Sequence, residues 1–162
     1  MPKLIQSTVK SQKLTIFLAD SSNNYIILFK QIITLLNLNC ELFVCSDGET
    51  LLNYINSKIL FPDYIFIDIN LPKINGVNCL SQIKTKYPSN TFYVIMMENK
   101  LCQSTINTCY RYGATCFIDK LVDEEFLKNI LNYCFNNLNQ NVFEKEFVLN
   151  KIVAKQTNME MM

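Results

Sequence analysis

The sequence predicts an α/β fold, a doubly wound parallel β-sheet with helices on both faces. Short apolar runs alternate along the chain with longer segments in which apolar residues recur every three or four positions. Turn-forming residues separate the two kinds of segment. Polar residues follow several of the short runs directly, as at Asp20, Asp68 and Lys120. This alternation is typical of parallel strands joined by right-handed helical crossovers.

The short apolar runs are expected to form five strands. The third run, Tyr64 to Ile67, is apolar throughout and leads directly into Asp68, a pattern typical of a strand buried on both faces. The loop signals Leu71-Pro72 and Asn75-Gly76 follow it. The predicted strands cover residues 14–19, 40–45, 64–68, 92–97 and 115–119.

The intervening segments have the spacing of amphipathic helices. Between the first two strands the apolar positions are Tyr25, Leu28, Phe29, Ile32, Ile33 and Leu36. Pro88 closes the third predicted helix and Gly113 ends the fourth. The predicted helices cover residues 23–37, 49–57, 77–87, 103–112 and 123–138.

The chain divides into a polar lead-in at residues 1–13, one domain at 14–138 and a C-terminal extension at 139–162. The extension carries apolar residues at near-helical spacing, namely Phe143, Phe147, Val148 and Ile152. It is interpreted either as a segment that packs on the domain or as an interaction helix. It is too short to be a helix-turn-helix output domain.

Composition excludes several classes of function. The chain has no histidine, so histidine general bases and histidine metal ligands are excluded. Its three glycines, Gly48, Gly76 and Gly113, cannot form a dinucleotide-binding or P-loop motif. The net charge is +1 and no basic stripe is present, so we expect no nucleic-acid partner.

The seven cysteines form no C-x-x-C pair, and most lie in apolar segments, which favours reduced, structural thiols. The N-terminus lacks the apolar core of a signal peptide, and no apolar run approaches the roughly 20 residues that span a bilayer. We therefore expect a cytoplasmic protein that does not bind membranes.

Charged residues at the strand ends form a candidate site, because the carboxyl ends of parallel strands meet at one edge of the sheet. Asp20 follows the first strand, Asp68 the third and Lys120 the fifth. Two carboxylates at one edge offer hard oxygen ligands for magnesium or calcium. Lys120 is expected to pair with Asp68, or with anionic oxygens attached to Asp68.

Three segments resemble the receiver domains of two-component response regulators. LADSSN resembles the acidic signature of the first strand, DINLPKINGV the phosphoacceptor segment, and YGATCFIDK the closing signature. The resemblance covers residues 13–138 and implies a flavodoxin-like (βα)5 fold with strand order 2-1-3-4-5. It further implies phosphorelay signal transduction, with a histidine kinase or another signalling protein as partner, rather than an enzyme.

The resemblance also assigns roles to individual residues. It makes Asp68 the phosphoacceptor, a carboxylate nucleophile, and Lys120 the cation beside it. Mg²⁺ would be held by Asp20, Asp68 and the backbone carbonyl of Asn70. Phe117 and Met97 would be the two switch positions, Met97 standing where the family has threonine or serine.

The chain departs from the family pattern mainly at this site. The pattern has two adjacent acids, and here Ser21 follows Asp20; in the alternative register Asp20 is the second acid and Ala19 replaces the first. Met97 cannot donate the hydrogen bond of a hydroxyl. Glu98 adds a negative charge beside it, and Leu121 replaces the usual proline after Lys120.

These departures favour an atypical receiver that acts mainly as a protein-interaction module, with impaired or absent phosphorylation and weak or absent Mg²⁺ binding. The alternative is a weak but functional receiver phosphorylated on Asp68, and self-association as a homodimer is a further hypothesis. A flavodoxin-like FMN protein is disfavoured because the loop after the first strand lacks a phosphate cradle. A haloacid-dehalogenase-like phosphatase is disfavoured because Asn70 stands where its second acid would be.

Overall fold

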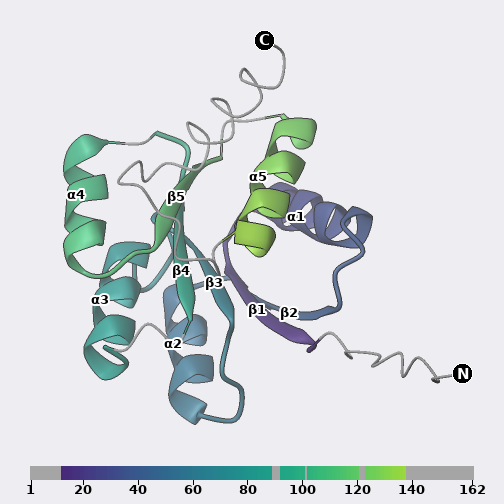
Figure 1. Ribbon diagram of the computed structural model, residues 1–162. Helices are drawn as coiled ribbons and strands as arrows, with labels where there is room; N and C mark the ends of the chain where they lie inside the picture. Colours follow the sequence, from purple (N-terminus) through teal and green to yellow (C-terminus); the bar gives the residue numbers. More distant parts are fainter. Residues whose placement is uncertain (1–11, 89–91, 101, 121–122, 138–162) are drawn as a thin grey trace, which may run out of the picture.

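The computed structural model describes residues 12–88, 92–100, 102–120 and 123–137. In this part of the chain five parallel strands form one sheet in the order β2-β1-β3-β4-β5 (Figure 1). The strands are β1 (Leu14–Ala19), β2 (Cys40–Cys45), β3 (Tyr64–Asp68), β4 (Tyr93–Glu98) and β5 (Cys116–Asp119). The predicted doubly wound, flavodoxin-like fold is confirmed.

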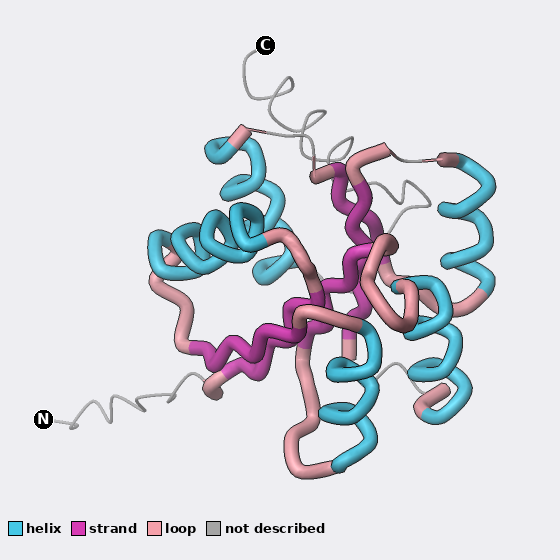
Figure 2. The backbone as a smooth tube through the Cα atoms, turned by 180° about the vertical axis from the view of Figure 1, so that it is seen from behind, coloured by secondary structure: helices cyan, strands magenta, loops and turns pink. Residues whose placement is uncertain are grey.

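A helix follows each strand. The helices are α1 (Asn23–Leu35), α2 (Gly48–Ser57), α3 (Gly76–Lys86), α4 (Gln103–Arg111) and α5 (Glu124–Asn137). Figure 2 shows α1 and α5 on one side of the sheet and the other three helices on the opposite side. All five predicted helices are therefore present, and their bounds differ from the predicted ones by one or two residues.

The pleat of the strands divides the core in two, because successive side chains of a strand point to opposite faces. Tyr64 and Phe66 of β3 belong to the cluster under α1 and α5, whereas Ile65 and Ile67 belong to the cluster under α2, α3 and α4. All five residues of β3 are buried, as expected for a central parallel strand. Both clusters therefore depend on β3.

Side-chain caps fix the starts of three helices, and these starts position the loops at the carboxyl edge of the sheet. The side chains of Ser22, Asp47 and Asn75 accept hydrogen bonds from backbone N–H groups in the first turns of α1, α2 and α3. α1 ends before the predicted residue 37 because Asn37 adopts a left-handed conformation with φ 50°.

All seven cysteines lie in the described residues and are free thiols, as the sequence predicts. None of the helices in the described part of the chain is both long and apolar enough to cross a membrane. The C-terminal extension and nearly all of the polar lead-in fall outside the described residues, so their predicted boundaries stay predictions.

Candidate functional site

The two acids and the lysine expected to converge at the carboxyl edge of the sheet are in direct contact. The ammonium of Lys120 donates hydrogen bonds to Asp20 Oδ2 at 2.7 Å and to Asp68 Oδ2 at 2.8 Å. The three residues come from the ends of β1, β3 and β5, which explains why residues 100 positions apart meet. The Lys120 side chain is 5% exposed, so the ion pairs are largely shielded from water.

Backbone amides engage the other oxygens of the two carboxylates. Asp20 Oδ1 accepts from the N–H of Ser22 at 2.8 Å, and Asp68 Oδ1 accepts from the N–H of Asn70 at 3.0 Å. Each of the four carboxylate oxygens therefore accepts a hydrogen bond from within the chain. A buried charge needs such partners to offset the loss of its hydration.

Burial and charge pairing oppose each other in this cluster. Burial raises the pKa of the Asp20 carboxyl, although the hydrogen bonds from Lys120 and Ser22 act to lower it. Burial acts to lower the pKa of Lys120, but the hydrogen bonds to Asp20 and Asp68 outweigh it and raise that pKa. Lys120 is therefore protonated at neutral pH.

Tyr25 covers the ammonium of Lys120 on the side of α1. The Lys120 nitrogen lies 4.5 Å from the centre of the Tyr25 ring, within the range of a cation–π contact. The Tyr25 hydroxyl donates to the sulfur of Met97 at 3.7 Å. The sequence predicts Tyr25 only as one of the apolar positions of a helix. Its hydroxyl is the one feature that indicates a polar partner, because a buried tyrosine O–H usually forms a hydrogen bond.

The two predicted switch positions, Met97 and Phe117, lie on opposite faces of the sheet. Met97 is fully buried in the cluster under α1 and α5, whereas Phe117 lies in the cluster on the opposite face. Because side chains alternate along a strand, Glu98 is the residue at the end of β4 that shares the face of Met96 and Phe117. Glu98 therefore lies on the Phe117 side of the sheet, whereas Met97 lies on the side of Tyr25.

Glu98 is tied to the loop that follows Asp68. The side-chain amide of Asn70 donates to Glu98 Oε1 at 2.8 Å and to Oε2 at 3.0 Å. The backbone N–H of Asn99 also donates to Oε1, at 2.9 Å. The carboxylate of Glu98 thus sits at the mouth of the site and adds a negative charge beside the two aspartates.

Phe117 is fixed in the core rather than exposed at the site. Its side chain is fully buried, and its ring meets the ring of Tyr110 edge to face with centroids 5.5 Å apart. This contact links β5 to α4, and hence the site edge to the surface beside β5. The neighbouring Arg111 and Tyr112 are exposed.

Close backbone packing holds the loop that carries Asn70. The N–H of Gly76 donates to the carbonyl of Ile69 at 2.9 Å, and the N–H of Gly48 donates to the carbonyl of Pro72 at 3.2 Å. Lys73, in a left-handed conformation with φ 63°, forms ion pairs of 3.1 Å with Asp47 and with Glu49. The loop is therefore anchored to the start of α2.

The predicted oxygen ligands for a cation are the carboxylates of Asp20 and Asp68 and the backbone carbonyl of Asn70, and the structure brings the two carboxylates together at Lys120. No group of three or more histidine, cysteine or acidic side chains suited to a metal ion occurs in the described residues. Ser21, which follows Asp20, is exposed and uncharged. The arrangement offers two carboxylates and one ammonium, a combination that binds or transfers anionic groups as well as cations.

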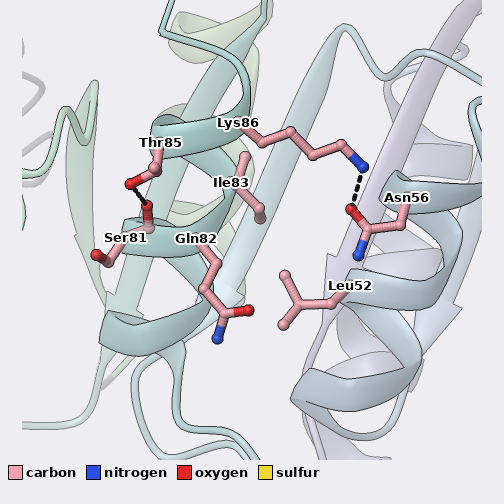
Figure 3. A pocket seen from close by; sticks show the side chains of 7 residues that line it. All are labelled: Leu52, Asn56, Ser81, Gln82, Ile83, Thr85 and Lys86. Carbon is pink, nitrogen blue, oxygen red and sulfur yellow. Dashed lines mark hydrogen bonds between the residues drawn. The ribbon is translucent and has the colours of Figure 1, made fainter.

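A hollow lies between α2 and α3 and contains none of these residues (Figure 3). It has a volume of about 450 Å³, and Lys86 closes one end by donating to Asn56 Oδ1 at 2.7 Å. Its lining residues are Leu52, Asn56, Ser81, Gln82, Ile83, Thr85 and Lys86. Because these side chains carry no acid and no nucleophilic cluster, the acidic edge remains the candidate functional site.

Comparison with known proteins identifies similar domains. The sequence model of the family described as response regulator receiver domain matches residues 16–132. A two-component response regulator-like protein, PRR37 of Oryza sativa, is 23% identical over 124 residues, which are 75% of this chain and 16% of that protein. The protein-glutamate methylesterase/protein-glutamine glutaminase of Pyrococcus abyssi is 28% identical over 110 residues, 67% of this chain and 29% of that protein. The chain thus spans less than a third of the length of these relatives.

Solved structures share the fold. The Mn²⁺-bound form of the response regulator Rcp1 aligns with a TM-score of 0.70 and 18% identity, covering 80% of this chain and 97% of that one. The CheX–CheY–BeF3–Mg²⁺ complex from Borrelia burgdorferi aligns with a TM-score of 0.64 and 25% identity, covering 75% and 89% of the two chains.

Proposed function

The chain belongs to the response regulator receiver family, and we propose that it acts in phosphorelay signal transduction mainly as a protein-interaction module, with phosphorylation of Asp68 impaired or absent. The observation that carries this proposal is the position of Glu98. Its carboxylate lies at the mouth of the site, on the face of the sheet that holds Phe117. Met97, which stands where the family pattern has a threonine or serine, precedes Glu98 in β4 and carries no hydroxyl either.

These two residues oppose phosphoryl transfer in two ways. Neither the Met97 thioether nor the Glu98 carboxylate can donate the hydrogen bond that a hydroxyl gives to a phosphoryl oxygen. Glu98 also repels the incoming anion: two like unit charges about 6 Å apart repel by about 3 kcal/mol at an effective dielectric constant of about 20. A barrier raised by that amount slows a reaction roughly a hundredfold.

Magnesium binding is proposed to be weak for a related reason. Divalent magnesium relies on carboxylate ligands and gives up its water reluctantly. The pair of acids in the family pattern is reduced to Asp20, and both Asp20 and Asp68 already bind Lys120. When bound, magnesium would neutralise charge on the phosphoryl group. This pocket offers magnesium few carboxylate oxygens that are not already paired with Lys120.

The alternative function is a weak but working receiver, in which Asp68 accepts a phosphoryl group from a histidine kinase or a phosphotransfer partner. Asp68 is 7% exposed at the edge of the sheet, and Lys120 already lies against it. In that case Asp68 acts as the nucleophile, and Lys120 neutralises charge on the transferred group. Both hypotheses therefore involve the same residues, Asp68 and Lys120. They differ in whether Glu98 prevents phosphorylation.

Incubation with acetyl phosphate and Mg²⁺, followed by intact-mass measurement, tests the proposal. We expect little or no phosphorylated wild-type protein, and a clear increase in Glu98→Thr, which removes the charge and adds a hydroxyl at the mouth of the site. Asp68→Asn and the double variant Asp68→Asn with Glu98→Thr should show none. Stoichiometric phosphorylation of the wild type that is lost in Asp68→Asn would establish the alternative.

As an interaction module, the protein is proposed to bind a histidine kinase or another signalling protein through the surface beside β5. Arg111 and Tyr112 are exposed there, and Tyr110 connects them to buried Phe117. A homodimer through the same surface is the second possibility. Light scattering over a range of protein concentrations distinguishes the two, because a mass that stays monomeric eliminates the dimer.

A further inference from the structure

Lys120 lies in an enclosure made by five elements of the fold. Asp20 and Asp68 accept two of the three N–H bonds of its ammonium, at 2.7 and 2.8 Å. The ring of Tyr25 covers another side of the nitrogen at 4.5 Å. β1, β3 and β5 supply the ion pairs, α1 supplies the ring, and β4 supplies Met97, which supports that ring.

Tyr25 is itself held at both ends. Its backbone N–H donates to Ser22 Oγ at 3.4 Å in the cap of α1, and the N–H of Ser22 donates to Asp20. Its hydroxyl donates to Met97 Sδ at 3.7 Å. The side chain is 8% exposed and has few alternative positions, so the ring acts as a fixed platform.

We propose that Tyr25 is a positioning residue that holds Lys120 against Asp20 and Asp68, so that the lysine ammonium serves as the resident cation of this pocket in place of a divalent metal. The inference rests on the proposed function, since it concerns the same pocket. It adds a role for a residue of α1 and states which cation occupies the pocket. Its principal test uses no phosphoryl donor.

A divalent metal and the Lys120 ammonium would compete for the same carboxylate oxygens. A divalent ion that bound Asp20 Oδ2 and Asp68 Oδ2 would displace the ammonium from both. The displaced ammonium would also lose its contact with the Tyr25 ring, which favours a cation within about 6 Å. Removing either Lys120 or the ring should therefore strengthen divalent metal binding, whereas removing the Tyr25 hydroxyl alone should change it less.

The first measurement is nuclear magnetic resonance of the lysine side-chain ammonium groups in ¹⁵N-labelled protein without metal. We expect a slowly exchanging Lys120 signal, absent in Lys120→Met, whose protons are shifted upfield by the Tyr25 ring. Tyr25→Leu should abolish the ring shift and speed exchange with water, and Tyr25→Phe should restore both. Tyr112→Leu, a substitution of an exposed tyrosine, should leave the signal unchanged.

The second measurement is Mn²⁺ or Mg²⁺ affinity by calorimetry. We expect weak binding by the wild type and by Tyr25→Phe, and binding tighter by about tenfold or more in Tyr25→Leu and Lys120→Met. Millimolar Mg²⁺ should displace the Lys120 signal as it binds.

Two results would overturn the inference. One is a Lys120 signal unaffected by Tyr25→Leu in a variant whose circular dichroism shows it to be folded. The other is Mg²⁺ binding by the wild type that leaves the Lys120 signal in place. Phosphorylation of the wild type by acetyl phosphate would refute the proposed function, yet would leave the metal-free Lys120 signal as expected here, so the two failures are distinguishable.

Discussion

Gly76 lies where the loop after Asp68 folds back against the end of β3. A Cβ atom at this position would lie 2.3 Å from the backbone oxygen of Asp68 and 2.8 Å from the Cα of Ile69. Neither backbone atom can move without disturbing β3, whose residues are all buried. The glycine is therefore required by close approach, although its own φ is not left-handed.

We expect Gly76→Ala to lower the free energy of unfolding by about 2 kcal/mol or more, since forcing extra atoms into a packed region costs typically 1–3 kcal/mol. Urea denaturation followed by circular dichroism measures the change. Asn53→Ala, on the exposed side of α2, is a control expected to stay within about 0.5 kcal/mol of the wild type. A Gly76→Ala protein as stable as that control would show that the loop packs differently.

Asp47 gives stability a predictable dependence on pH. The N–H of Thr50, which Asp47 caps, lowers the pKa of its carboxyl below the ordinary value of 3.8, and Lys73 adds to this. A carboxyl whose pKa is lower in the folded state binds protons more readily when unfolded. Its stabilisation is therefore present above about pH 3.8 and is lost as the pH falls through the folded-state value.

The comparison of wild type with Asp47→Asn isolates this contribution, because asparagine keeps the cap but cannot ionise. We expect the difference in the free energy of unfolding to be constant from pH 7 to pH 5 and to shrink as the pH falls below about 4. Denaturant titrations at several pH values provide the measurement. A difference that grows on acidification has the opposite sign and would contradict the assignment.

At the scale of elements, the cysteines differ in reactivity according to where each lies. Cys102 precedes α4, is exposed, and forms contacts with Ser104 that lower the pKa of its thiol. Burial raises the pKa of Cys45 to about 12, and that of Cys79 and Cys109 to about 11. The thiolate is the reactive form, so these sites should react at very different rates.

We expect iodoacetamide at about pH 7.5 to modify Cys102 first, with the five buried cysteines protected until the protein unfolds. Peptide mass spectrometry identifies the modified site, and Cys102→Ser should remove the fast phase. Cys40→Ser is the matched control, since Cys40 is half-buried and burial raises its thiol pKa. Fast labelling of a buried cysteine in native protein would mean that its element opens readily.

The helices and strands are predictable from the sequence because apolar residues recur every three or four positions in helices and in continuous or alternating runs in strands. Asp20, Asp68 and Lys120 are predictable at one edge because the carboxyl ends of parallel strands meet there. The face on which a residue near a strand end lies is harder to predict. Shifting a β residue by one position moves its side chain to the other face, so a one-residue difference in register decides which of Met97 and Glu98 faces Phe117. Only the pairing of β4 with β3 and β5 settles which of them faces Phe117.

The cation–π contact of Tyr25 with Lys120 was not predictable for a different reason. It joins residues 95 positions apart in the chain (120 − 25 = 95) through the way α1 packs on the sheet. Helical spacing predicts that Tyr25 faces the core, but spacing carries no information about which polar group its ring meets there. Likewise, the loop that Lys73 anchors to α2 depends on contacts between elements rather than on its own sequence.

At the scale of the whole molecule, β3 makes the two halves of the core interdependent. Phe66 packs under α1 and α5, with ring centroids 5.0 Å from Phe29 and 6.0 Å from Phe135. Its neighbour Ile67 packs on the opposite face with α2, α3 and α4. Because successive residues of one strand serve both clusters, loss of either cluster exposes β3, and the domain should unfold as a single unit.

We expect Phe66→Ala to lower the free energy of unfolding by about 3–5 kcal/mol, a large share of the 5–15 kcal/mol typical of a domain. Leu80→Ala, in the other cluster, should cost about 2–5 kcal/mol. Each variant should unfold in one transition when near-ultraviolet and far-ultraviolet circular dichroism are followed together. Phe61→Ala is the matched control, because that ring is 60% exposed and should change stability little. Separate transitions by the two probes would show that the clusters under α1/α5 and under α2, α3 and α4 fold independently, which a shared central strand does not allow.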